Sequence, residues 1–463
     1  MREDFNLFKS NIKNKHVAIV GLGISNMPLI NFLMKFGCKI TLFDRRNIEE
    51  FNDNEIKNFN SLNIKFVFGK NYLNYIKGFD YIFKTPSIRP DIEEFNDVKK
   101  DGCIITSEIE ELLKYCPSKI YGVTGSDGKT TTTTILYNLL KNSNFKTWLG
   151  GNIGVPLFSK IEEMKKEDKV VLELSSFQLM NVENSPDVSI ITNISPNHLD
   201  YHKDMNEYIE CKKNIFKFQD ENGIVILNHD CEISKSFENE IKGRIRKFSL
   251  SSSVPKDVME HGAYLKEDSL FVLNQRIFSK NQMRIKGYHN ISNFASAILS
   301  TIPEVNSSTI RDFVKYFSGV KHRNEFVCEI NGRSFYNDSI ASSPTRTLAT
   351  LSCFDRKVIL ICGGYDKNIS YVPLLSGENK IKKLYLIGDT KQKILNVFKN
   401  NNSEIQIKIF EDFEKLIIDA YNDSEEGDII LLSPASASFD MFKNFEERGE
   451  KFINIVNKLK ASK

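Results

Sequence analysis

The chain contains no pair of closely spaced cysteines. Its eight cysteines lie at positions 38, 103, 116, 211, 231, 328, 353 and 362, and no CxxC motif occurs among its 463 residues. Structural zinc ribbons need such pairs, and a chain of this length is not expected to depend on a disulfide framework. We therefore expect reduced thiols and a cytoplasmic protein.

An excess of charge of one sign is also missing. The 63 Lys and Arg residues nearly balance the 60 Asp and Glu residues, which leaves a formal net charge of +3. A nucleic-acid-binding protein usually carries a concentrated basic surplus. We expect small molecules, and no nucleic acid, as partners.

Long hydrophobic runs are absent as well. Residues 17–34 carry no charge, but Gly21, Gly23 and Pro28 interrupt them, and acidic residues stand in the leader before them. A membrane span needs about 20 consecutive apolar residues, and a signal peptide begins with a basic region. The stretch therefore predicts a strand, a glycine turn and a helix, and we expect no association with a membrane.

Short apolar runs alternate with helical patterns in three series, which is typical of parallel sheets covered by helices. About 150 residues per domain also gives three domains. We predict an α/β fold with a Rossmann-like domain at 1–107, a central P-loop ATPase-like domain with a mostly parallel sheet at 108–318, and a second Rossmann-like domain at 319–463. The runs are HVAIV (16–20), KITLFD (39–44), IKFVFG (64–69), DYIFKT (80–85), IYGVTG (120–125), KVVLELS (169–175), VSIITN (188–193), GIVILN (223–228), KVILICGG (357–364), KKLYLIGD (382–389) and DIILLSPA (428–435).

The first glycine turn, at residues 21–26, directly follows a predicted strand. It differs from the dinucleotide pattern G-x-G-x-x-G because Asn26 replaces the third glycine, although Asp44 imitates the acidic residue that binds a ribose. Three interpretations stay open: a dinucleotide site, a turn without a ligand, and a site for another nucleotide.

The second glycine turn, Thr124-Gly125-Ser126-Asp127-Gly128-Lys129-Thr130-Thr131, also lies between a strand and a helix. Small residues let backbone N–H groups surround phosphate oxygens. In such loops a lysine neutralises the outer phosphates and a hydroxyl binds Mg²⁺, which are the roles open to Lys129 and Thr130. Because Val123 occupies a position where the strict motif has glycine, this is a compact variant, and we expect it to bind ATP.

Three polar residues of the central series stand where parallel sheets place ligands. Glu173 interrupts an apolar strand, and a buried carboxylate is costly unless a cation such as Mg²⁺ pairs with it. His198 follows another strand, where a structural role and a ligand role are both open. Lys212 lies on a predicted helix, where a solvated surface lysine is the simpler interpretation.

The last series places hydroxyl and basic side chains at the ends of its strands. The turn at residues 363–367 ends in Lys367, Asp338 follows a short strand, and serines recur at residues 433–438. With Arg323, these groups suit an anionic ligand. Hydroxyl groups at such places also cap helices.

The motifs, taken in order, resemble the Mur ligases, the ATP-dependent amide-forming enzymes of peptidoglycan synthesis. The resemblance covers essentially the whole chain. Each motif is weak alone, whereas the ordered set is strong, and the last motif is similar to that of the members that add D-glutamate. The motifs are TGSDGKTTT (124–132), GGNIG (150–154), LELSSFQL (172–179), NHLDYH (197–202), GYHN (287–290), HR (322–323), YNDS (336–339), GGYDK (363–367) and SPASASFDMFKNFEERG (433–449).

The resemblance implies a ligase that joins D-glutamate to UDP-N-acetylmuramoyl-L-alanine, with ATP cleaved to ADP and phosphate. The matching positions for the UDP substrate are Ser25, Asp44, Arg45, Asn152, Ser175 and Gln178. Those for ATP are Gly125, Ser126, Asp127, Gly128, Lys129, Thr130, Thr131, Asn290, Arg323 and Asp338. Those for D-glutamate are Ser342, Lys367, Ser438 and Phe445.

The same resemblance implies two Mg²⁺ ions held by Thr130, Glu173, His198 and Lys212, with Lys212 carrying a carbamate. The modification makes chemical sense, because carbon dioxide on the amine turns a repelling cation into an anion suited to Mg²⁺. Lys129, His198 and Lys212 are the residues expected to act in catalysis. By resemblance we also expect a monomer.

Two positions depart from the family pattern. Ile340 stands where a lysine usually follows Asn-Asp-Ser, which leaves Lys367 and Ser342 for the D-glutamate side chain, and Thr85-Pro86-Ser87 replaces the usual Ser-Pro-Gly near the uridine site. Three rivals stay open: a ligase of this superfamily with another amino acid, a dinucleotide-dependent oxidoreductase, and an ATP-binding regulatory module.

Overall fold

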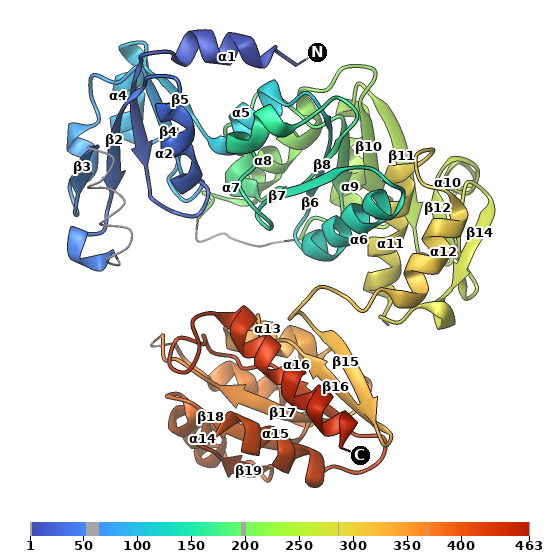
Figure 1. The fold of residues 1–463 in the computed structure, drawn as a ribbon. Coiled ribbons are helices and arrows are strands. Elements are labelled where there is room, and N and C mark those ends of the chain that lie inside the picture. Colours follow the sequence, from blue (N-terminus) through green and yellow to red (C-terminus); the bar gives the residue numbers. More distant parts are fainter. Residues whose placement is uncertain (1, 52–63, 196–200, 286, 368, 463) are drawn as a thin grey trace. The chain divides into compact units, whose positions relative to one another are not determined.

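Three β-sheets follow one another along the chain, each with helices beside it (Figure 1). The structure is a computed structural model and describes residues 2–51, 64–195, 201–285, 287–367 and 369–462. It divides into two compact units, Met1–Gln282 with Tyr288–Lys315, and Met283–Gly287 with Tyr316–Lys463. The first unit holds two of the sheets and the second unit holds the third.

The first sheet is parallel throughout, in the order β3-β2-β1-β4-β5. The chain leaves β1 toward β2 on one side and later returns to β4 on the other. In a parallel sheet such a reversal opens a crevice at the carboxyl ends of the strands, where ligands bind. The strands are β1 (His16–Val20), β2 (Lys39–Asp44), β3 (Lys65–Phe68), β4 (Tyr81–Lys84) and β5 (Ile104–Thr106), and the helices are α1 (Phe5–Ile12), α2 (Met27–Met34), η1 (Ile48–Glu50), η2 (Tyr72–Tyr75) and α4 (Glu93–Lys100).

The central sheet has the order β14-β13-β12-β11-β10-β9-β6-β8-β7, parallel from β7 to β12, with the antiparallel strands β13 and β14 at one edge. Its strands are β6 (Lys119–Thr124), β7 (Thr147–Gly151), β8 (Lys169–Glu173), β9 (Val188–Ile191), β10 (Ile224–Asn228), β11 (Arg244–Ser249), β12 (Ala263–Lys266), β13 (Ser269–Val272) and β14 (Gln275–Ser279). Its helices are α5 (Glu108–Tyr115), α6 (Lys129–Asn142), η3 (Phe158–Glu163), α7 (Ser176–Leu179), α8 (Met205–Lys217), α9 (Glu232–Lys235), η4 (Ser236–Glu240), α10 (Lys256–His261), η5 (Lys280–Gln282), α11 (Tyr288–Thr301) and α12 (Ser307–Tyr316).

The second unit contains a mostly parallel sheet in the order β15-β16-β20-β17-β18-β19, in which only the pair β15–β16 is antiparallel among the described strands. Its strands are β15 (Glu325–Ile330), β16 (Arg333–Asn337), β17 (Val358–Gly363), β18 (Ile381–Ile387), β19 (Gln406–Ile409) and β20 (Ile429–Leu432). Its helices are α13 (Pro344–Leu351), η6 (Val372–Lys380), α14 (Lys391–Asn400), α15 (Phe413–Asn422) and α16 (Phe445–Ala461).

One hydrophobic core runs through both sheets of the first unit. Phe8 of α1 and Phe32 of α2 contact Phe158 of η3, with ring centroids 4.9 and 5.5 Å apart. Burial of large aromatic rings is among the strongest stabilising contributions in a core. The two domains predicted at 1–107 and 108–318 therefore share an apolar contact, and their boundaries stay a prediction.

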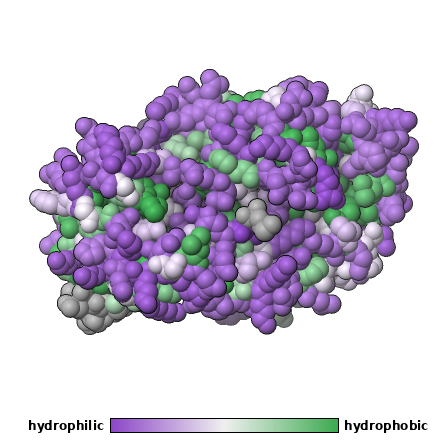
Figure 2. Space-filling view, turned by 90° about the horizontal axis from the view of Figure 1, so that it is seen from above, coloured by the Kyte–Doolittle hydropathy of each residue, from purple (hydrophilic) through white to green (hydrophobic). Residues whose placement is uncertain are grey.

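The predicted α/β class is confirmed, and every apolar run predicted as a strand forms one. Strands with weaker apolar patterns, β12 to β15 among them, are not predicted from the sequence because half-exposed antiparallel strands alternate in polarity. Within the described residues no helix is both long and apolar enough to cross a membrane. The face in Figure 2 is mostly hydrophilic, with small scattered hydrophobic areas.

Candidate active site

The predicted phosphate loop joins β6 to α6. Gly128 precedes the helix with φ 78°, and a Cβ at this position would overlap with Oδ1 of Asn293 from α11. Gly125 has φ 151°, and a Cβ there would overlap with Oγ1 of Thr192. Both positions therefore require glycine. Because the first amides of a helix lack intrahelical acceptors, the loop has the form of an anion site.

Two lysine side chains converge on one carbonyl of this loop. Lys129 Nζ and Lys212 Nζ each lie 2.8 Å from the oxygen of Gly125, and Lys129 also donates to the Ser126 oxygen at 2.8 Å. Lys212, on α8, is only 1% exposed, and its ammonium group lies 4.7 Å from the ring centroid of Tyr208. Burial, and then the charge of Lys129, lower the pKa of Lys212 well below its usual value. Lys212 is therefore a buried amine and not a surface lysine.

Glu173 ends β8 next to the start of the phosphate loop, because its register partner on β6 is Val123. Its side chain is buried, and Oε1 accepts a hydrogen bond from Nδ2 of Asn152 at 2.9 Å. Oε2 is buried and has no hydrogen-bond donor among the described residues. Such an oxygen is costly unless a cation approaches it. The carboxylate therefore has the environment of a metal ligand, and its role as one stays a prediction.

Three of the four predicted Mg²⁺ ligands lie in the described part of the chain. Thr130 is half-buried in the first turn of α6, and Glu173 and Lys212 are both buried. His198 lies outside the described residues. Among those described, no three His, Cys, Asp or Glu side chains gather as a metal-binding group. A set of one hydroxyl, one carboxylate and one lysine is not such a group, so the predicted ligands stay a prediction.

The first glycine turn is held by Asp44. Oδ2 of Asp44 accepts from the Leu22 amide at 2.7 Å, and both carboxylate oxygens accept from the Arg46 guanidinium at 3.0 Å. Burial alone would raise the pKa of Asp44, but hydrogen bonds from Arg46 and Leu22 bring it below its usual value. Asp44 is thus an ionised anchor of the turn. The other predicted contacts here, Ser25 and Arg45, are half-buried and exposed, and their role stays a prediction.

Asn26, which replaces the third glycine of the dinucleotide pattern, has a structural function. It is fully buried, and its Nδ2 donates to the carbonyl oxygens of Val20 and Gly21 at 3.2 and 3.0 Å. In the dinucleotide pattern the third glycine allows close packing of the helix on the strand. Here the Asn26 side chain instead ties the start of α2 to the end of β1 by hydrogen bonds.

Ser175 and Gln178 cap the short helix α7 together. The Gln178 amide donates to Ser175 Oγ at 3.3 Å, and the Ser175 amide donates to Gln178 Oε1 at 3.0 Å. This is the reciprocal capping box that fixes a helix start. Both side chains are half-buried and lie directly after β8, so their predicted contact with the UDP substrate stays a prediction.

In the second unit, Asp338 joins the ends of several elements. It accepts from the Asn324 amide at 3.1 Å, Thr350 Oγ1 at 2.6 Å and Ser433 Oγ at 2.7 Å. Burial raises the pKa of Asp338 to about 6, partly offset by these hydrogen bonds. Of the other predicted ATP contacts, Arg323 is exposed in this unit, and Asn290 is half-buried in the first unit.

Three of the predicted D-glutamate residues, Ser342, Lys367 and Ser438, lie on loops after β16, β17 and β20 of the second unit, and Phe445 is the first residue of α16. Lys367 is exposed, with its ammonium group 6.0 Å from the Phe439 ring centroid, whereas Ser438 is 2% exposed. Ser342 and Phe445 are half-buried, and the Phe445 carbonyl accepts from Ser339 Oγ at 2.8 Å.

The buried Arg448 organises these loops, and it is not among the predicted site residues. It is 3% exposed and donates to the carbonyl oxygens of Ser339, Ser436 and Ala437 at 2.8, 3.1 and 2.9 Å, and to Ser339 Oγ at 3.0 Å. Burial lowers the pKa of Arg448 to about 10. The signal is visible in the sequence, because Arg448 lies four residues before the buried Phe452 on the inner face of α16.

Three family descriptions match this chain in order. They are the MurD-like N-terminal domain of Mur ligases at residues 15–107, the Mur ligase middle domain at residues 123–301 and the glutamate ligase domain of Mur ligases at residues 322–436. The chain is also similar to proteins named UDP-N-acetylmuramoylalanine--D-glutamate ligase. It is 51% identical to that of Clostridium acetobutylicum and 50% identical to that of Clostridium perfringens, over 99% of this chain and 100% of each relative.

Solved structures with this fold are more distant in sequence. The UDP-N-acetylmuramate-alanine ligase of Thermotoga maritima has a TM-score of 0.57 at 17% identity and covers 97% of this chain and 100% of its own. A pseudomurein peptide ligase type C from Methanothermus fervidus has a TM-score of 0.52 at 20% identity, over 96% and 100% of the two chains. At these identities the likeness supports the fold alone.

Proposed function

The chain belongs to the Mur ligase family, and from this membership we propose that it joins D-glutamate to UDP-N-acetylmuramoyl-L-alanine in an ATP-dependent reaction of peptidoglycan precursor synthesis. The observation that carries the proposal is an identity of about half over the full length of relatives with that name. We also propose that the enzyme works in the cytoplasm as a monomer.

The reaction we propose has two steps. The terminal L-alanyl carboxylate attacks the γ-phosphorus of ATP, which forms an acyl phosphate and releases ADP. The amine of D-glutamate then attacks the activated carbonyl carbon, and phosphate leaves through a tetrahedral intermediate. In the first step an anion approaches an anion, so the protein has to place positive charge around the phosphates.

Lys129 is the residue we propose for that charge. It begins α6 inside the phosphate loop, and its Nζ donates to the loop carbonyls of Gly125 and Ser126. These two acceptors hold the ammonium group beside the amides at the helix start. The arrangement provides a preorganised cation next to a preorganised set of N–H donors.

We propose that Mg²⁺ binds Thr130 and Glu173 beside the loop, together with His198 and carbamylated Lys212. The metal would supply charge stabilisation for the phosphate oxygens. The support in this chain is the buried Oε2 of Glu173, which has no donor among the described residues. The role of Asn152 is then to hold Oε1, which fixes the direction of the carboxylate.

The environment of Lys212 favours carbamylation. Only a neutral amine attacks carbon dioxide, and burial together with the nearby Lys129 charge favours the neutral form of Lys212. The product would carry a negative charge beside Lys129, in place of an amine whose protonation the Lys129 charge opposes. A ¹³C-bicarbonate label that appears on the wild-type protein and not on Lys212→Met would support this assignment.

For the amino-acid substrates we propose Ser342, Lys367, Ser438 and Phe445 as the D-glutamate contacts. For the UDP substrate we propose Ser25, Asp44, Arg45, Asn152, Ser175 and Gln178. Asp44, Ser175 and Gln178 already serve the local structure, so we expect them to act partly by holding the backbone in place. Asn290, Arg323 and Asp338 stay our proposed ATP contacts beyond the phosphate loop.

ADP release tests the proposal directly. The purified protein is given Mg²⁺, ATP and UDP-N-acetylmuramoyl-L-alanine, with D-glutamate, L-glutamate, L-alanine or a diamino acid added in turn. We expect turnover with D-glutamate alone. In Lys129→Ala the turnover rate should fall about 10²- to 10³-fold, as for removal of an oxyanion-stabilising group. Lys141 is an exposed lysine of the same helix, and Lys141→Ala should turn over normally. Turnover with a different amino acid would contradict the proposed substrate and keep the family.

A further inference from the structure

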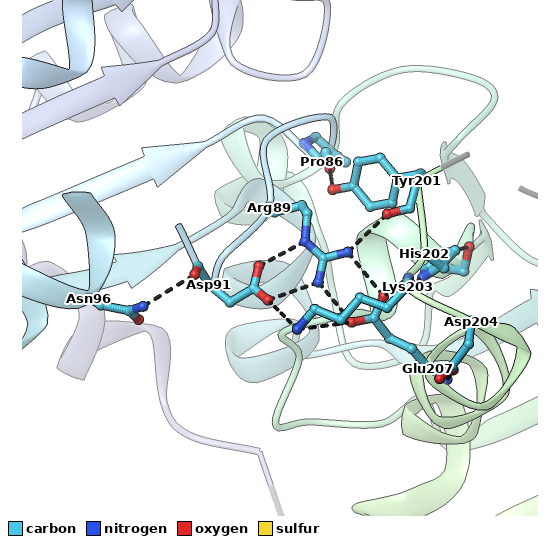
Figure 3. A network of polar contacts seen from close by, with 10 residues as sticks. Pro86, Arg89, Asp91, Asn96, Tyr201, His202, Lys203, Asp204 and Glu207 are labelled. Carbon is cyan, nitrogen blue, oxygen red and sulfur yellow. Dashed lines mark hydrogen bonds and ion pairs between the residues drawn. The ribbon is translucent and has the colours of Figure 1, made fainter. Parts of the chain in front are cut away.

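Two domains of the first unit are joined by a cluster of charges that the proposed reaction does not use (Figure 3). The cluster consists of Arg89 and Asp91, from the segment after β4, of Lys203, which lies just before α8, and of Glu207, from the first turn of α8. Two positive and two negative side chains balance one another. The Arg89 and Glu207 side chains are each 21% exposed, so the centre of the cluster is largely shielded from water.

Arg89 uses all five of its N–H donors in this cluster. Two of them bind the Asp91 carboxylate at 2.8 Å each, two bind the Glu207 carboxylate at 2.7 and 3.0 Å, and Nη1 also donates to the Tyr201 carbonyl at 3.0 Å. Two-pronged Arg–carboxylate pairs are the most strongly directional of ionic contacts. The hydrogen bond from Arg89 is the main reason that the pKa of Glu207 falls to about 2.

Further contacts cross the same boundary. Lys203 Nζ lies 3.1 Å from Asp91 Oδ2, and the Tyr201 hydroxyl donates to the Pro86 carbonyl at 3.1 Å. The Arg89 guanidinium also lies 5.6 Å from the Tyr201 ring centroid. Directional hydrogen bonds and the attraction of opposite charges therefore both hold the segment 86–91 against the segment 201–207.

On the first domain's side, this segment is fastened to the first glycine turn. The Thr85 amide donates to the Val20 carbonyl at 2.9 Å, and a Cβ on Gly21 would overlap with the Thr85 side chain. The turn is where we propose that the UDP substrate binds. A shift of residues 85–91 would therefore shift the turn.

On the central domain's side, the cluster is fastened to the phosphate loop through α8. The Glu207 amide donates to Asp204 Oδ1 at 2.8 Å at the start of the helix. One residue later, the Tyr208 hydroxyl lies 2.9 Å from Ser126 Oγ in the phosphate loop, and Lys212 reaches the same loop from the next turn of the helix. The helix thus connects the charge cluster with the place where the acyl phosphate would form.

From this continuous set of contacts we infer that Arg89 is a positioning residue: its bridge to Glu207 and Tyr201 sets the distance between the UDP-substrate turn and the phosphate loop. The inference rests on the proposed function, because it assigns the two ends of the UDP substrate to these two places. The substrate spans the boundary, whereas the phosphate-loop contacts of ATP lie in the central domain. Loss of the bridge therefore weakens binding of the UDP substrate without a matching effect on ATP.

Steady-state kinetics of Arg89→Met, Glu207→Gln and the double variant test the inference. We expect KM for UDP-N-acetylmuramoyl-L-alanine to rise about three- to tenfold, the range for a well-formed ionic network that is partly exposed. KM for ATP should stay within about twofold. The double variant should resemble Arg89→Met, because loss of the guanidinium already breaks the whole bridge, whereas Glu207→Gln keeps the hydrogen bond from Arg89 to Tyr201. Arg89→Lys keeps the charge without the two-pronged geometry and should fall between Arg89→Met and the wild type.

Lys247→Met is the matched control. Lys247 is 19% exposed and also lies between two carboxylates, Glu238 at 3.1 Å and Asp257 at 2.7 Å, but all three residues belong to the central domain. We expect its KM values to equal those of the wild type. Unchanged kinetics in Arg89→Met, equal rises of both KM values, or additive effects in the double variant would overturn the inference. If Arg89→Met does not fold, Glu207→Gln and Arg89→Lys carry the same test.

Hydrogen–deuterium exchange separates this inference from the proposed function. In Arg89→Met, amides of residues 85–91 and 201–207 should exchange faster than in the wild type, with no such change in Lys247→Met. This readout needs no substrate, so it stands even if the wild-type protein does not turn over with D-glutamate. Unchanged exchange on both sides of the boundary would overturn the bridge itself.

Discussion

Replacement of Arg448 by methionine should destabilise the second unit and weaken D-glutamate binding. The guanidinium makes four hydrogen bonds to Ser339, Ser436 and Ala437, and every acceptor is an uncharged oxygen. Methionine keeps the aliphatic volume but leaves these buried oxygens without their donor. Each such loss costs about 1–3 kcal/mol.

The net cost is smaller than the total of those losses, because Arg448 is itself a desolvated cation. Its pKa falls to about 10 through burial, so removal of the charge returns roughly 3 kcal/mol of desolvation energy. The four losses together cost about 4–12 kcal/mol, so we expect the free energy of unfolding to decrease by about 1–9 kcal/mol after this return, and the melting temperature of the second unit to decrease by at least a few degrees. KM for D-glutamate should rise about tenfold, because the loop around Ser438 loses its support.

Two optical signals allow the effect to be assigned to the correct unit. Trp148 is the only tryptophan of the chain and lies on β7 in the first unit, so its fluorescence follows that unit alone. Far-UV circular dichroism follows both units. In Arg448→Met, the melting transition followed by circular dichroism should shift to lower temperature by much more than the transition followed by Trp148 fluorescence.

Arg333→Met is the matched control. The hydrogen bonds of Arg333 also go to uncharged oxygens, those of Ser424 and Asn331, but the Arg333 side chain is half-exposed. Water replaces a lost donor at such a site, so a decrease below about 1 kcal/mol is expected. The reasoning on Arg448 would be refuted if the two variants were equally stable, or if Arg448→Met bound D-glutamate normally.

Three further predictions concern the first unit. Glu173→Gln should raise the Mg²⁺ concentration that gives half-maximal turnover by at least tenfold, whereas the exposed Glu163→Gln should leave it unchanged. Gly128→Ala should weaken ATP binding at least tenfold in a titration with ATP, because the loop must move away from the side chain of Asn293. The pKa of Glu207 is lowered to about 2, so its contribution to stability is complete above the usual value near 4.5 and is lost as the pH falls toward 2. At pH 7 we expect the wild type to be more stable than Glu207→Gln by about 1 kcal/mol. In urea titrations this difference should disappear as the pH falls from 4.5 toward 2.

Local sequence determined the strands, the glycine turns and the family. Apolar runs such as residues 16–20 and 120–124 form strands because their side chains are buried on both faces of a parallel sheet. The phosphate loop could be predicted because its chemistry is contained in eight consecutive residues. The ordered motifs then determined the ligase family, which the comparisons confirm.

The tertiary structure decided what distant residues do to one another. Lys212 is a surface lysine by its local pattern, and only packing of α8 against the phosphate loop makes it a buried amine beside Lys129. Arg89 and its partner Glu207 are 118 residues apart in the sequence. Arg448 is buried because it contacts loops that follow separate strands, and its partner Ser339 lies 109 residues earlier in the chain. Sequence patterns record the polarity and spacing of neighbours along the chain, whereas the free energy of a charge depends on its neighbours in space.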